Sequence, residues 1–282
     1  MGLELTRDAE DFAARVEPFL AARVERNVLA TVLYSVRVLG PYSDEPPLFA
    51  TLTDDSTQAI AGVAIRTPPW PLLATGLDTE LEAVNLMHAW LKHDPDPPGV
   101  SGEPDTARAL AAAYESLTGN GWELQFAEAL HALTQVTDPP RPAPGALRQA
   151  TDADKPTLLE WERGFIEEAG MGDPNYAEKA VQRRLTAGLQ YVWTETNGAP
   201  VSTLGHNQPI ARAVRIGPVY TPQEHRNHGY ASSAVAVLSR QLLATRAERC
   251  LLFTDLANPT SNKIYASVGY VRIADWEQHR FI

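Results

Sequence analysis

The chain has 282 residues, 44% of them hydrophobic and 21% charged, which is typical of a globular protein with one large domain or two of about 140 residues. No apolar run reaches the roughly 20 residues that a membrane helix needs, and the N-terminus lacks the apolar core of a signal peptide. The single cysteine, Cys250, excludes an internal disulfide, so we expect a cytoplasmic protein without a membrane partner.

The net charge of −11 is unevenly distributed. Residues 1–145 hold 21 Asp and Glu against 9 Lys and Arg, whereas residues 146–282 hold 14 against 15. No strongly basic face is indicated, so nucleic acid is not expected as a partner. The acidic half is either a solvated surface or a field that attracts a cationic amine.

The first half of the chain has weaker patterns than the second. A helix is predicted over residues 9–24, and the runs 48–53 and 60–65 flank Asp54-Asp55-Ser56 as the strands of a hairpin would. Residues 77–91 and 106–117 favour helices, and a strand is expected within 122–136. These elements roughly follow the order of those in the second half. A diverged second copy and a helper domain both remain open, because no sequence repeat is visible.

A proline-rich segment separates the two halves. Residues 138–145 contain four prolines in eight residues, which disfavours a helix or a central strand and favours a stiff linker. We therefore expect one domain over residues 1–140 and a second over 146–282.

After this linker the pattern alternates between strands and helices. Strands are predicted at 147–150, 190–196, 201–206, 213–220 and 250–255, and another begins at 270–273. Asn197-Gly198 indicates a hairpin between two of them. Helices are predicted at 151–165, 176–185, 231–242 and 262–268. The result is an α/β class with a mixed sheet that carries helices on its faces.

The loop at residues 225–232 carries the strongest chemical signal. It joins the predicted strand that ends near Tyr220 to the amphipathic helix that begins near Ala231. Successive main-chain N–H groups at a helix N-terminus bind phosphate, and the helix dipole adds partial positive charge. Gly229 and Ala231 are small enough for phosphates to approach the backbone closely, and Arg226 and His228 are candidates for further hydrogen bonds.

These residues resemble the GNAT superfamily of N-acyltransferases, whose loop reads Gln/Arg-x-x-Gly-x-Gly/Ala and is matched by Arg226-x-x-Gly229-x-Ala231. The longer string over 217–231 is similar to a bacterial subgroup of tandem, or two-domain, GNAT proteins. Residues 258–270 resemble the superfamily segment Asn-x-x-Ala-x-x-x-Tyr-x-x-x-Gly-Phe, with Ser261 and Tyr270 as mild departures. The resemblance covers residues 146–282 and only isolated stretches of the first half.

The resemblance implies a GNAT fold in the second half and a degenerate GNAT-like or helper domain in the first. It implies acetyl-CoA (coenzyme A) as co-substrate, without a metal. A main-chain N–H near Val219 is the candidate oxyanion donor, and the strand before the loop is expected to splay from its neighbour to bind the pantetheine arm. The residues expected to bind coenzyme A are Val219, Tyr220, Thr221, Arg226, Asn227, His228, Gly229, Tyr230, Ala231, Ser232 and Asn258.

The expected reaction is transfer of an acetyl group to the primary amine of a small molecule, by direct attack in a ternary complex. Tyr265 is the expected general acid, because a phenol with a pKa of about 10 can protonate a departing thiolate. The alternative for Tyr265 is packing on the sheet with its hydroxyl bonded to the backbone, and the alternative for Asn258 is an Asx turn or a helix N-cap before Pro259. A protein or peptide amine is the rival acceptor. A non-catalytic acyl-CoA sensor is the rival class, and the chain is expected to be a monomer or a homodimer.

The general base is the weakest part of the expected mechanism. Strand 213–220 lacks the glutamate that many relatives have there. Glu224 and His206 are the other candidates, but a solvated side chain is the favoured interpretation of Glu224 and a structural role that of His206. Carboxylates at 160, 167 and 168 lie on the helical region that commonly lines the acceptor site in the family, where they either hold a cation or cover a surface. No equivalent of the Arg-x-x-Gly-x-Gly/Ala loop occurs in residues 1–145, so the first half is expected to have lost coenzyme A binding and to wall the acceptor pocket.

Overall fold

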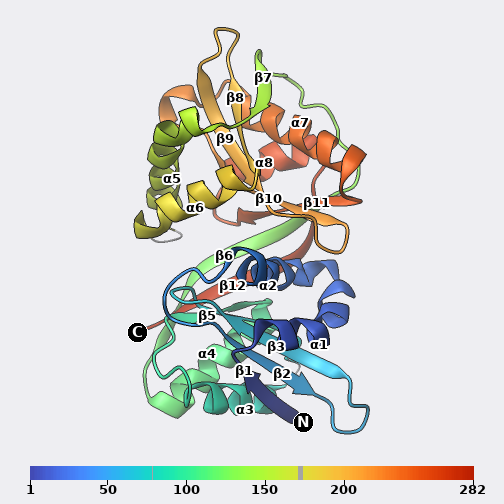
Figure 1. The fold of residues 1–282 in the computed structure, drawn as a ribbon, viewed down its shortest axis with the longest axis vertical. Helices are drawn as coiled ribbons and strands as arrows, with labels where there is room; N and C mark the ends of the chain where they lie inside the picture. Colours follow the sequence, from blue (N-terminus) through green and yellow to red (C-terminus); the bar gives the residue numbers. More distant parts are fainter. Residues whose placement is uncertain (78, 171–173) are drawn as a thin grey trace. The chain divides into compact units, whose positions relative to one another are not determined.

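The computed structural model describes residues 1–77, 79–170 and 174–282, and its contacts divide them into two compact units (Figure 1). Unit 1 consists of residues 1–130, 255–257 and 273–282, and unit 2 of residues 131–254 and 258–272. Residues 131–145 therefore group with the second half, and the C-terminal residues group with the first. Whether 1–140 and 146–282 fold as independent domains stays a prediction.

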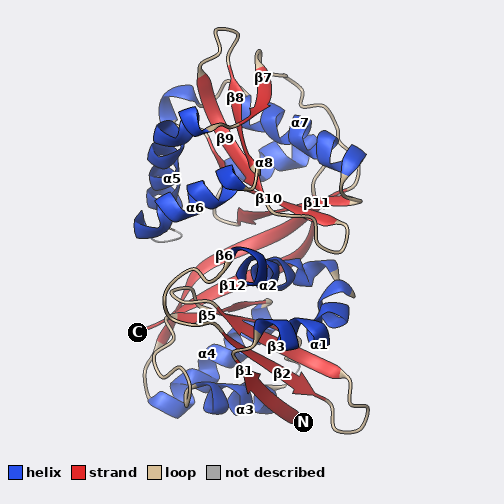
Figure 2. Ribbon diagram, viewed as in Figure 1, coloured by secondary structure: helices blue, strands red, loops and turns tan. Residues whose placement is uncertain are grey.

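Unit 1 has a mostly antiparallel sheet with helices packed on it (Figure 2). Its strand order is β1-β2-β3-β4-β5-β12-β6, and β4 and β5 are parallel. The C-terminal strand β12 (Val271–Phe281) lies antiparallel to β5, with Glu277 opposite Gly102. The other elements are β1 (Gly2–Thr6), α1 (Ala9–Ala21), α2 (Asn27–Leu39), β2 (Leu48–Thr53), β3 (Ile60–Arg66), β4 (Leu72–Thr75), α3 (Glu80–Trp90), β5 (Gly99–Gly102), α4 (Pro104–Thr118) and β6 (Trp122–Leu133).

Helical periodicity explains how α1 attaches to this sheet. Asp8 caps the helix by accepting from the N–H groups of Glu10 and Asp11. Phe12, Val16 and Leu20 recur at a four-residue interval and are all buried. The Phe12 ring stacks on Phe49 of β2 with centroids 4.8 Å apart. The amphipathic stripe is therefore the surface by which α1 packs on the sheet.

Unit 2 has the strand order β6-β11-β10-β9-β8-β7, to which β6 contributes its last residues. Strands β7 to β10 are antiparallel, whereas β10 and β11 are parallel. The elements are β7 (Ala146–Gln149), α5 (Lys155–Ala169), α6 (Ala177–Thr186), β8 (Gln190–Thr194), β9 (Pro200–His206), β10 (Ala213–Tyr220), α7 (Tyr230–Thr245), β11 (Arg249–Asp255) and α8 (Pro259–Val268).

The two faces of this sheet are covered by different helices. Val192 of β8 packs with Leu158 of α5 and Val181 of α6, whereas Trp193 belongs to the core cluster that contains Leu238 of α7. Successive residues of a strand point to opposite faces. One face is therefore covered by α5 and α6 and the other by α7 and α8, which is the layered α/β class that the sequence predicts (Figure 2).

The predicted elements of the second half are found close to their predicted limits. The strand over 213–220 has those bounds, the hairpin turns at Asn197-Gly198, and residues 138–145 contain no helix or strand. The first half was predicted less completely. Strands β1, β4 and β5 and helix α2 were missed, whereas the hairpin of β2 and β3 and helices α1, α3 and α4 were found.

Both halves of the chain follow the same order of elements. The series β1-α1-α2-β2-β3-β4-α3-β5-α4-β6 is repeated as β7-α5-α6-β8-β9-β10-α7-β11-α8-β12, apart from short 3-10 turns. The first half is therefore a second copy of the topology, in agreement with the first of the two alternatives above. Within the described residues, no helix has the length and apolar character to cross a membrane, and no group of three His, Cys, Asp or Glu side chains is arranged to hold a metal ion.

Candidate functional site

The loop between β10 and α7 presents a row of free main-chain donors. Residues 226–229 are not helical, and α7 begins at Tyr230. Among the described residues, the N–H groups of 227–232 have no hydrogen-bond acceptor, and no side chain caps the helix. The first helical N–H with a partner in this region is that of Ser233, which donates to the Gly229 carbonyl at 3.0 Å. Unpaired donors at a helix N-terminus are suited to an anion.

Backbone conformation produces this arrangement. Asn227 has a φ of 67° and Gly229 a φ of 80°, and both values lie in the left-handed region. Glycine adopts that region without a steric penalty and asparagine tolerates it better than most residues. Two left-handed residues separated by one make the chain turn sharply into α7. Asn227 and His228 are exposed, so the first residues of the row are accessible, whereas Tyr230 and Ser232 are buried.

Strand β10 separates from β11 just before this loop. Residues Ala213–Arg215 pair with Arg249–Leu251, but β10 continues to Tyr220 and β11 to Asp255 without further pairing between them. On its other side β10 pairs with β9, with a bulge between Ile216 and Val219. A bulge bends its strand and increases the local twist. The splay that the resemblance implies is therefore present, and it opens toward the loop at 226–232.

The three strand residues predicted to bind the cofactor have different surroundings. Val219 lies opposite Leu204 and packs against the α7-side core, whereas the Tyr220 ring faces α5. The Tyr220 carbonyl accepts from Ser202 Oγ at 3.0 Å, and the Thr221 carbonyl accepts from Arg226 Nε at 2.9 Å. Two of the three carbonyls therefore already have donors.

Arg226 has contacts that its sequence position does not reveal. Besides the Thr221 carbonyl, its guanidinium binds Glu168 of α5 through Nη2. Tyr220 donates to the other oxygen of the same carboxylate at 2.8 Å. Burial and the bond to Glu168 raise the pKa of Tyr220 to about 12. Burial works to raise the pKa of Glu168, but the bonds from Arg226 and Tyr220 leave it below its usual value.

The proline-rich linker lies against the same loop. A Cβ atom at Gly229 would meet the Arg141 carbonyl oxygen at 3.1 Å and the Ala143 Cβ at 3.9 Å. The Ala143 N–H donates to Ser233 Oγ at 2.8 Å, within the first turn of α7. The small size of residue 229 is therefore already needed for the approach of the linker. Sequence reasoning missed this contact, because the motif does not encode which segment passes over it.

The remaining residues of the loop and helix start are held by side-chain contacts. The His228 ring stacks on the Tyr230 ring with centroids 5.5 Å apart, and the Tyr230 hydroxyl donates to Glu195 at 2.6 Å. Ser232 is buried and its hydroxyl donates to the Gly229 carbonyl at 2.9 Å, while Ala231 is partly buried. Together these contacts fix the first turn of α7.

Tyr265 is buried in α8 within the core cluster that also contains Ile216 of β10. Its ring meets Tyr270 edge-on, with centroids 6.1 Å apart, and no hydrogen bond to its hydroxyl occurs among the described residues. Burial raises the pKa of Tyr265 to about 12, so the phenol is protonated at neutral pH. The packing of the structural alternative is therefore present, but the hydrogen bond from the hydroxyl to the backbone that belongs to it is not found among the described residues.

Asn258 has the geometry of a helix cap. Its side-chain oxygen accepts from the Ser261 N–H at 3.1 Å, and α8 begins at Pro259. This is the structural alternative that the sequence left open, and a contact from Asn258 to the cofactor stays a prediction.

The candidate general bases differ in burial and in the face of the sheet on which they lie. His206 is buried, its Nδ1 lies 2.7 Å from the Asn207 carbonyl, and its ring lies 5.7 Å from that of Tyr191, which packs on the α7 side. Burial lowers the pKa of His206, so it is neutral at neutral pH, and it lies on the face opposite to Tyr220. By contrast, Glu224 and the carboxylates at 160 and 167 are exposed.

A buried polar network on the α5 side was not predicted. Arg184 of α6 donates to Gln190 Oε1 at 2.6 Å and pairs with Glu162 of α5. Gln190 in turn donates to Thr203 Oγ1 at 2.6 Å. Gly205 provides the room, because a Cβ there would lie 3.0 Å from the Arg184 side chain. The network ties α5 and α6 to β8 and β9, and only the three-dimensional pairing of strands reveals it.

In unit 1 the start of α3 corresponds by element order to the start of α7 in unit 2, but the two helix starts differ in chemistry. The N-terminus of α3 is closed by a capping box in which Thr79 and Glu82 each satisfy the other's main-chain N–H. Leu72–Ala74 of β4 pair with Val100–Gly102 of β5, and a Cβ at Gly102 would lie 2.6 Å from the Ala74 carbonyl oxygen. Strands β4 and β5 therefore remain paired up to the end of β5, and the acidic side chain of Glu82 lies at the start of α3.

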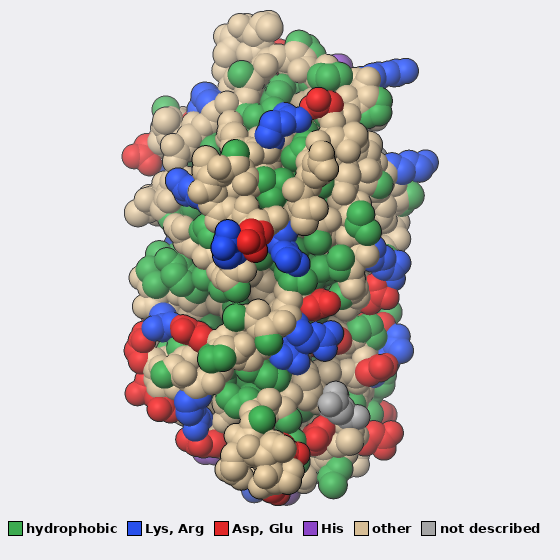
Figure 3. All heavy atoms as spheres, turned by 90° about the vertical axis from the view of Figure 1, so that its right-hand side faces the viewer, with side chains coloured by type: hydrophobic (Ala, Val, Ile, Leu, Met, Phe, Trp, Pro, Cys, Tyr) green, Lys and Arg blue, Asp and Glu red, His purple; other side chains and the backbone are tan. Residues whose placement is uncertain are grey.

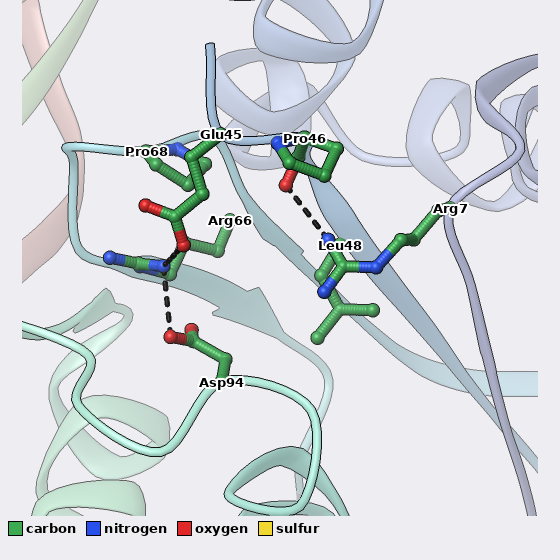
Figure 4. Close-up of a pocket in the computed structure, with 7 residues that line it drawn as sticks. All are labelled: Arg7, Glu45, Pro46, Leu48, Arg66, Pro68 and Asp94. Carbon is green, nitrogen blue, oxygen red and sulfur yellow. Dashed lines mark hydrogen bonds and ion pairs between the residues drawn. The ribbon is translucent and has the colours of Figure 1, made fainter. Parts of the chain in front are cut away.

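A polar niche of unit 1 is filled by its own ion pair (Figure 4). Arg66, at the end of β3, binds Asp94 at 2.9 Å and Glu45 at 3.3 Å. Trp90 Nε1 donates to the second oxygen of Asp94 at 2.8 Å. Arg7 at the rim donates to the Pro46 carbonyl at 2.9 Å. Arg66 Nη1 and both oxygens of Asp94 are paired within the niche, although Arg66 Nε has no hydrogen-bond partner among the described residues, so we interpret the niche as a structural ion pair.

The charged side chains on one face of the molecule are mixed in sign (Figure 3). On that face Lys and Arg are interspersed with Asp and Glu, without a continuous basic patch. This distribution fits a net charge of −11 and offers no stripe for a polyanion on the face shown.

Comparison with known proteins agrees with this geometry. Residues 211–281, which contain the loop and α8, match the family model described as FR47-like protein. No curated protein matches the sequence.

Among solved structures, an acetyltransferase of the GNAT family from Colwellia psychrerythraea has a TM-score of 0.62 at 10% identity, with 100% of this chain and 99% of that chain covered. A tandem GNAT protein from the clavulanic acid biosynthesis pathway has a TM-score of 0.61 at 14% identity, with 100% and 98% covered. A GCN5-related N-acetyltransferase-like protein from Streptococcus suis has a TM-score of 0.56 at 16% identity, with 98% and 100% covered. The fold is thus that of GNAT acetyltransferases, written in two halves of the same topology, and residues 211–281 match the FR47-like family model.

Proposed function

We propose that this protein transfers an acetyl group from acetyl-CoA to the primary amine of a small molecule, by direct attack in a ternary complex. The observation that carries the proposal is the row of unpaired N–H groups over residues 227–232, at the start of α7. A pyrophosphate supplies acceptor oxygens and negative charge for such donors. The fold of the GNAT acetyltransferases supports acyl transfer in general.

The opening between β10 and β11 suits an extended arm that leads away from this loop. Its main-chain groups have lost their parallel partner beyond Arg215. We assign the binding of the pantetheine arm to Val219, Tyr220 and Thr221, with the Val219 N–H as oxyanion donor. The bulge between Ile216 and Val219 supports this assignment, because it turns main-chain groups out of the regular ladder.

The cofactor supplies an activated thioester carbonyl, and the chain must help its thiolate to leave. Tyr265 holds a proton at neutral pH, since its pKa is about 12. A simple thiol has a pKa of about 8.5, so complete proton transfer from this phenol would be uphill. We therefore assign Tyr265 the role of hydrogen-bond donor to the developing thiolate, and the proton lost by the attacking amine balances the one that the thiol product gains.

Deprotonation of the amine is left to water or to a carboxylate on the α5 side. Glu168 is already bound to Arg226 and Tyr220, and His206 lies on the other face of the sheet. This arrangement favours an acceptor that is neutral when bound, because desolvation lowers the pKa of an amine. The same arrangement supports the second candidate function, an acyl-CoA sensor without turnover.

We further propose one cofactor site per chain. The capping box satisfies the N–H groups of Thr79 and Glu82 and places a carboxylate at the start of α3, and β4 and β5 are paired over Leu72–Ala74 and Val100–Gly102; both features disfavour an anion with an extended arm in unit 1. A small-molecule reaction in the cytoplasm, without nucleic acid, membrane or metal, is consistent with the charge and composition of the chain.

Two measurements test the proposal. Calorimetric titration with acetyl-CoA should give one site per chain, and a stoichiometry of two would contradict the assignment to unit 2 alone. Incubation with acetyl-CoA and a library of small amines should release free thiol with at least one of them. Tight binding without thiol release for any amine would favour the sensor, release only with peptide amines would favour the protein substrate, and absence of binding would refute the site itself.

A further inference from the structure

Glu168 stands at the junction of the helix α5 and the loop that holds the unpaired N–H groups. It lies in the last turn of α5, just before the helix ends at Gly170. Its two oxygens bind donors from different segments, the Tyr220 hydroxyl at 2.8 Å and the Arg226 guanidinium. One carboxylate therefore links a helix, a strand end and a loop.

Arg226 connects Glu168 to the loop at residues 226–232. Its Nε donates to the Thr221 carbonyl at 2.9 Å, which closes the turn between residues 221 and 226. The next residue, Asn227, is the first of the left-handed positions that direct the N–H groups of 227–232. A shift of Arg226 therefore moves the start of the donor row.

Tyr220 limits the movement of the same junction. A Cβ at Gly164 would lie 2.7 Å from the Tyr220 hydroxyl, so the phenol lies against the backbone of α5. The Phe165 ring meets the Tyr220 ring edge-on, with centroids 6.4 Å apart. Packing and hydrogen bonding thus fix the distance between α5 and the end of β10.

We infer that Glu168 is a positioning residue, which holds the cofactor loop in its binding conformation by bracing Arg226 against α5. The inference rests on the proposed function of the loop and adds a coupling between the helix α5 and the affinity for coenzyme A. Glu168 acts through Arg226 and does not touch the phosphates. The two side chains of the pair are 46% and 39% exposed, so salt screens their attraction and the effect on affinity is moderate.

The test compares acetyl-CoA affinities measured by calorimetry in E168Q, R226Q, the double variant and the matched control E248Q. Glu248 forms an ion pair of 3.0 Å with Arg212 on the surface of the same unit, away from the loop. We expect E168Q to weaken binding about five-fold and E248Q to leave it unchanged. In protein that already carries R226Q, adding E168Q should not weaken acetyl-CoA binding any further. The KM for acetyl-CoA should rise in E168Q while kcat changes less than two-fold, and E168D should restore part of the affinity.

The outcomes separate the two proposals. Wild-type protein that does not bind acetyl-CoA refutes the proposed function and the inference together. Wild-type binding with unchanged affinity in E168Q overturns the inference alone. Equal effects of E168Q in the presence and absence of Arg226 also overturn it, because Glu168 would then act by another route. Circular dichroism and thermal unfolding of each variant verify that it is folded.

Discussion

Substitution of Gly229 by alanine tests the loop most directly. The residue has a φ of 80° and a ψ of 10°, a conformation that costs about 1 kcal/mol for alanine. The added methyl group would also lie 3.1 Å from the Arg141 carbonyl oxygen, so the linker or the loop must shift by a few tenths of an ångström. A displaced donor row should lose at least one charge-assisted hydrogen bond to a phosphate, worth about 1.5–3 kcal/mol, which corresponds to a 10- to 100-fold loss of affinity for acetyl-CoA.

The matched control is Gly119→Ala at the end of α4. Gly119 has a φ of 78° and a ψ of −1°, but nothing lies within 4 Å of its hypothetical Cβ. Both variants should therefore lose about 1 kcal/mol from the left-handed conformation in denaturant unfolding, and Gly229→Ala should lose more because of its contact with the Arg141 carbonyl. Only Gly229→Ala should lose acetyl-CoA affinity in calorimetry. Wild-type affinity in Gly229→Ala would refute the reasoning that a narrow main-chain approach at this residue forms the binding site.

Three further predictions follow from named contacts. Tyr265→Phe should lower kcat at least ten-fold and leave the KM for acetyl-CoA nearly unchanged in steady-state assays of thiol release, since only the donated hydrogen bond is lost. A rise in KM as large as the fall in kcat would contradict this role. The Arg148 hydrogen bond lowers the pKa of Asp154 from 3.8 to about 2, so this stabilisation is present above about pH 4 and is lost as the pH falls toward 2. Arg148→Ala should therefore flatten the loss of stability in that window, as measured by urea unfolding at each pH, and an unchanged slope would count against the pair. Asp94→Ala should destabilise the protein by about 3–5 kcal/mol in the same assay, because it leaves the buried Arg66 without its nearest partner, and a loss below 1 kcal/mol would show that Glu45 compensates.

The sequence predicted the loop because its determinants are local. Gly229 and Ala231 follow a strand and precede an apolar helix within about ten residues, and short-range patterns of this kind are readable without knowledge of the fold. The contact between Arg226 and Glu168 was not predictable in the same way. Those residues are 58 positions apart, and only the packing of α5 against the end of β10 brings them together.

The elements missed in the first half have physical explanations too. Helix α2 contains four valines, a threonine and a tyrosine among its 13 residues, which favour strands, yet its Leu29, Leu33 and Val36 form one buried stripe. Strand β5 has only four residues, Gly99–Gly102, and glycine weakens the strand signal. Its place in the sheet depends on β4 and on β12, which comes from the far end of the chain. In these elements the secondary structure is determined by contacts with distant parts of the chain rather than by local propensity.

The two halves together show that the order of elements does not decide whether a cofactor site exists. Both contain a pair of parallel strands joined by a helix, but the local chemistry at the start of that helix differs. At α3 the Thr79 and Glu82 side chains satisfy each other's main-chain N–H groups, and Glu80 and Glu82 add negative charge. At α7 a left-handed glycine replaces the cap, no acidic residue lies in the first turn, and the strand before it has separated from its neighbour. Because an anion needs free donors and an opening at once, we expect only the second arrangement to bind a pyrophosphate, and we propose that the fold shared by both halves serves in the first as a scaffold.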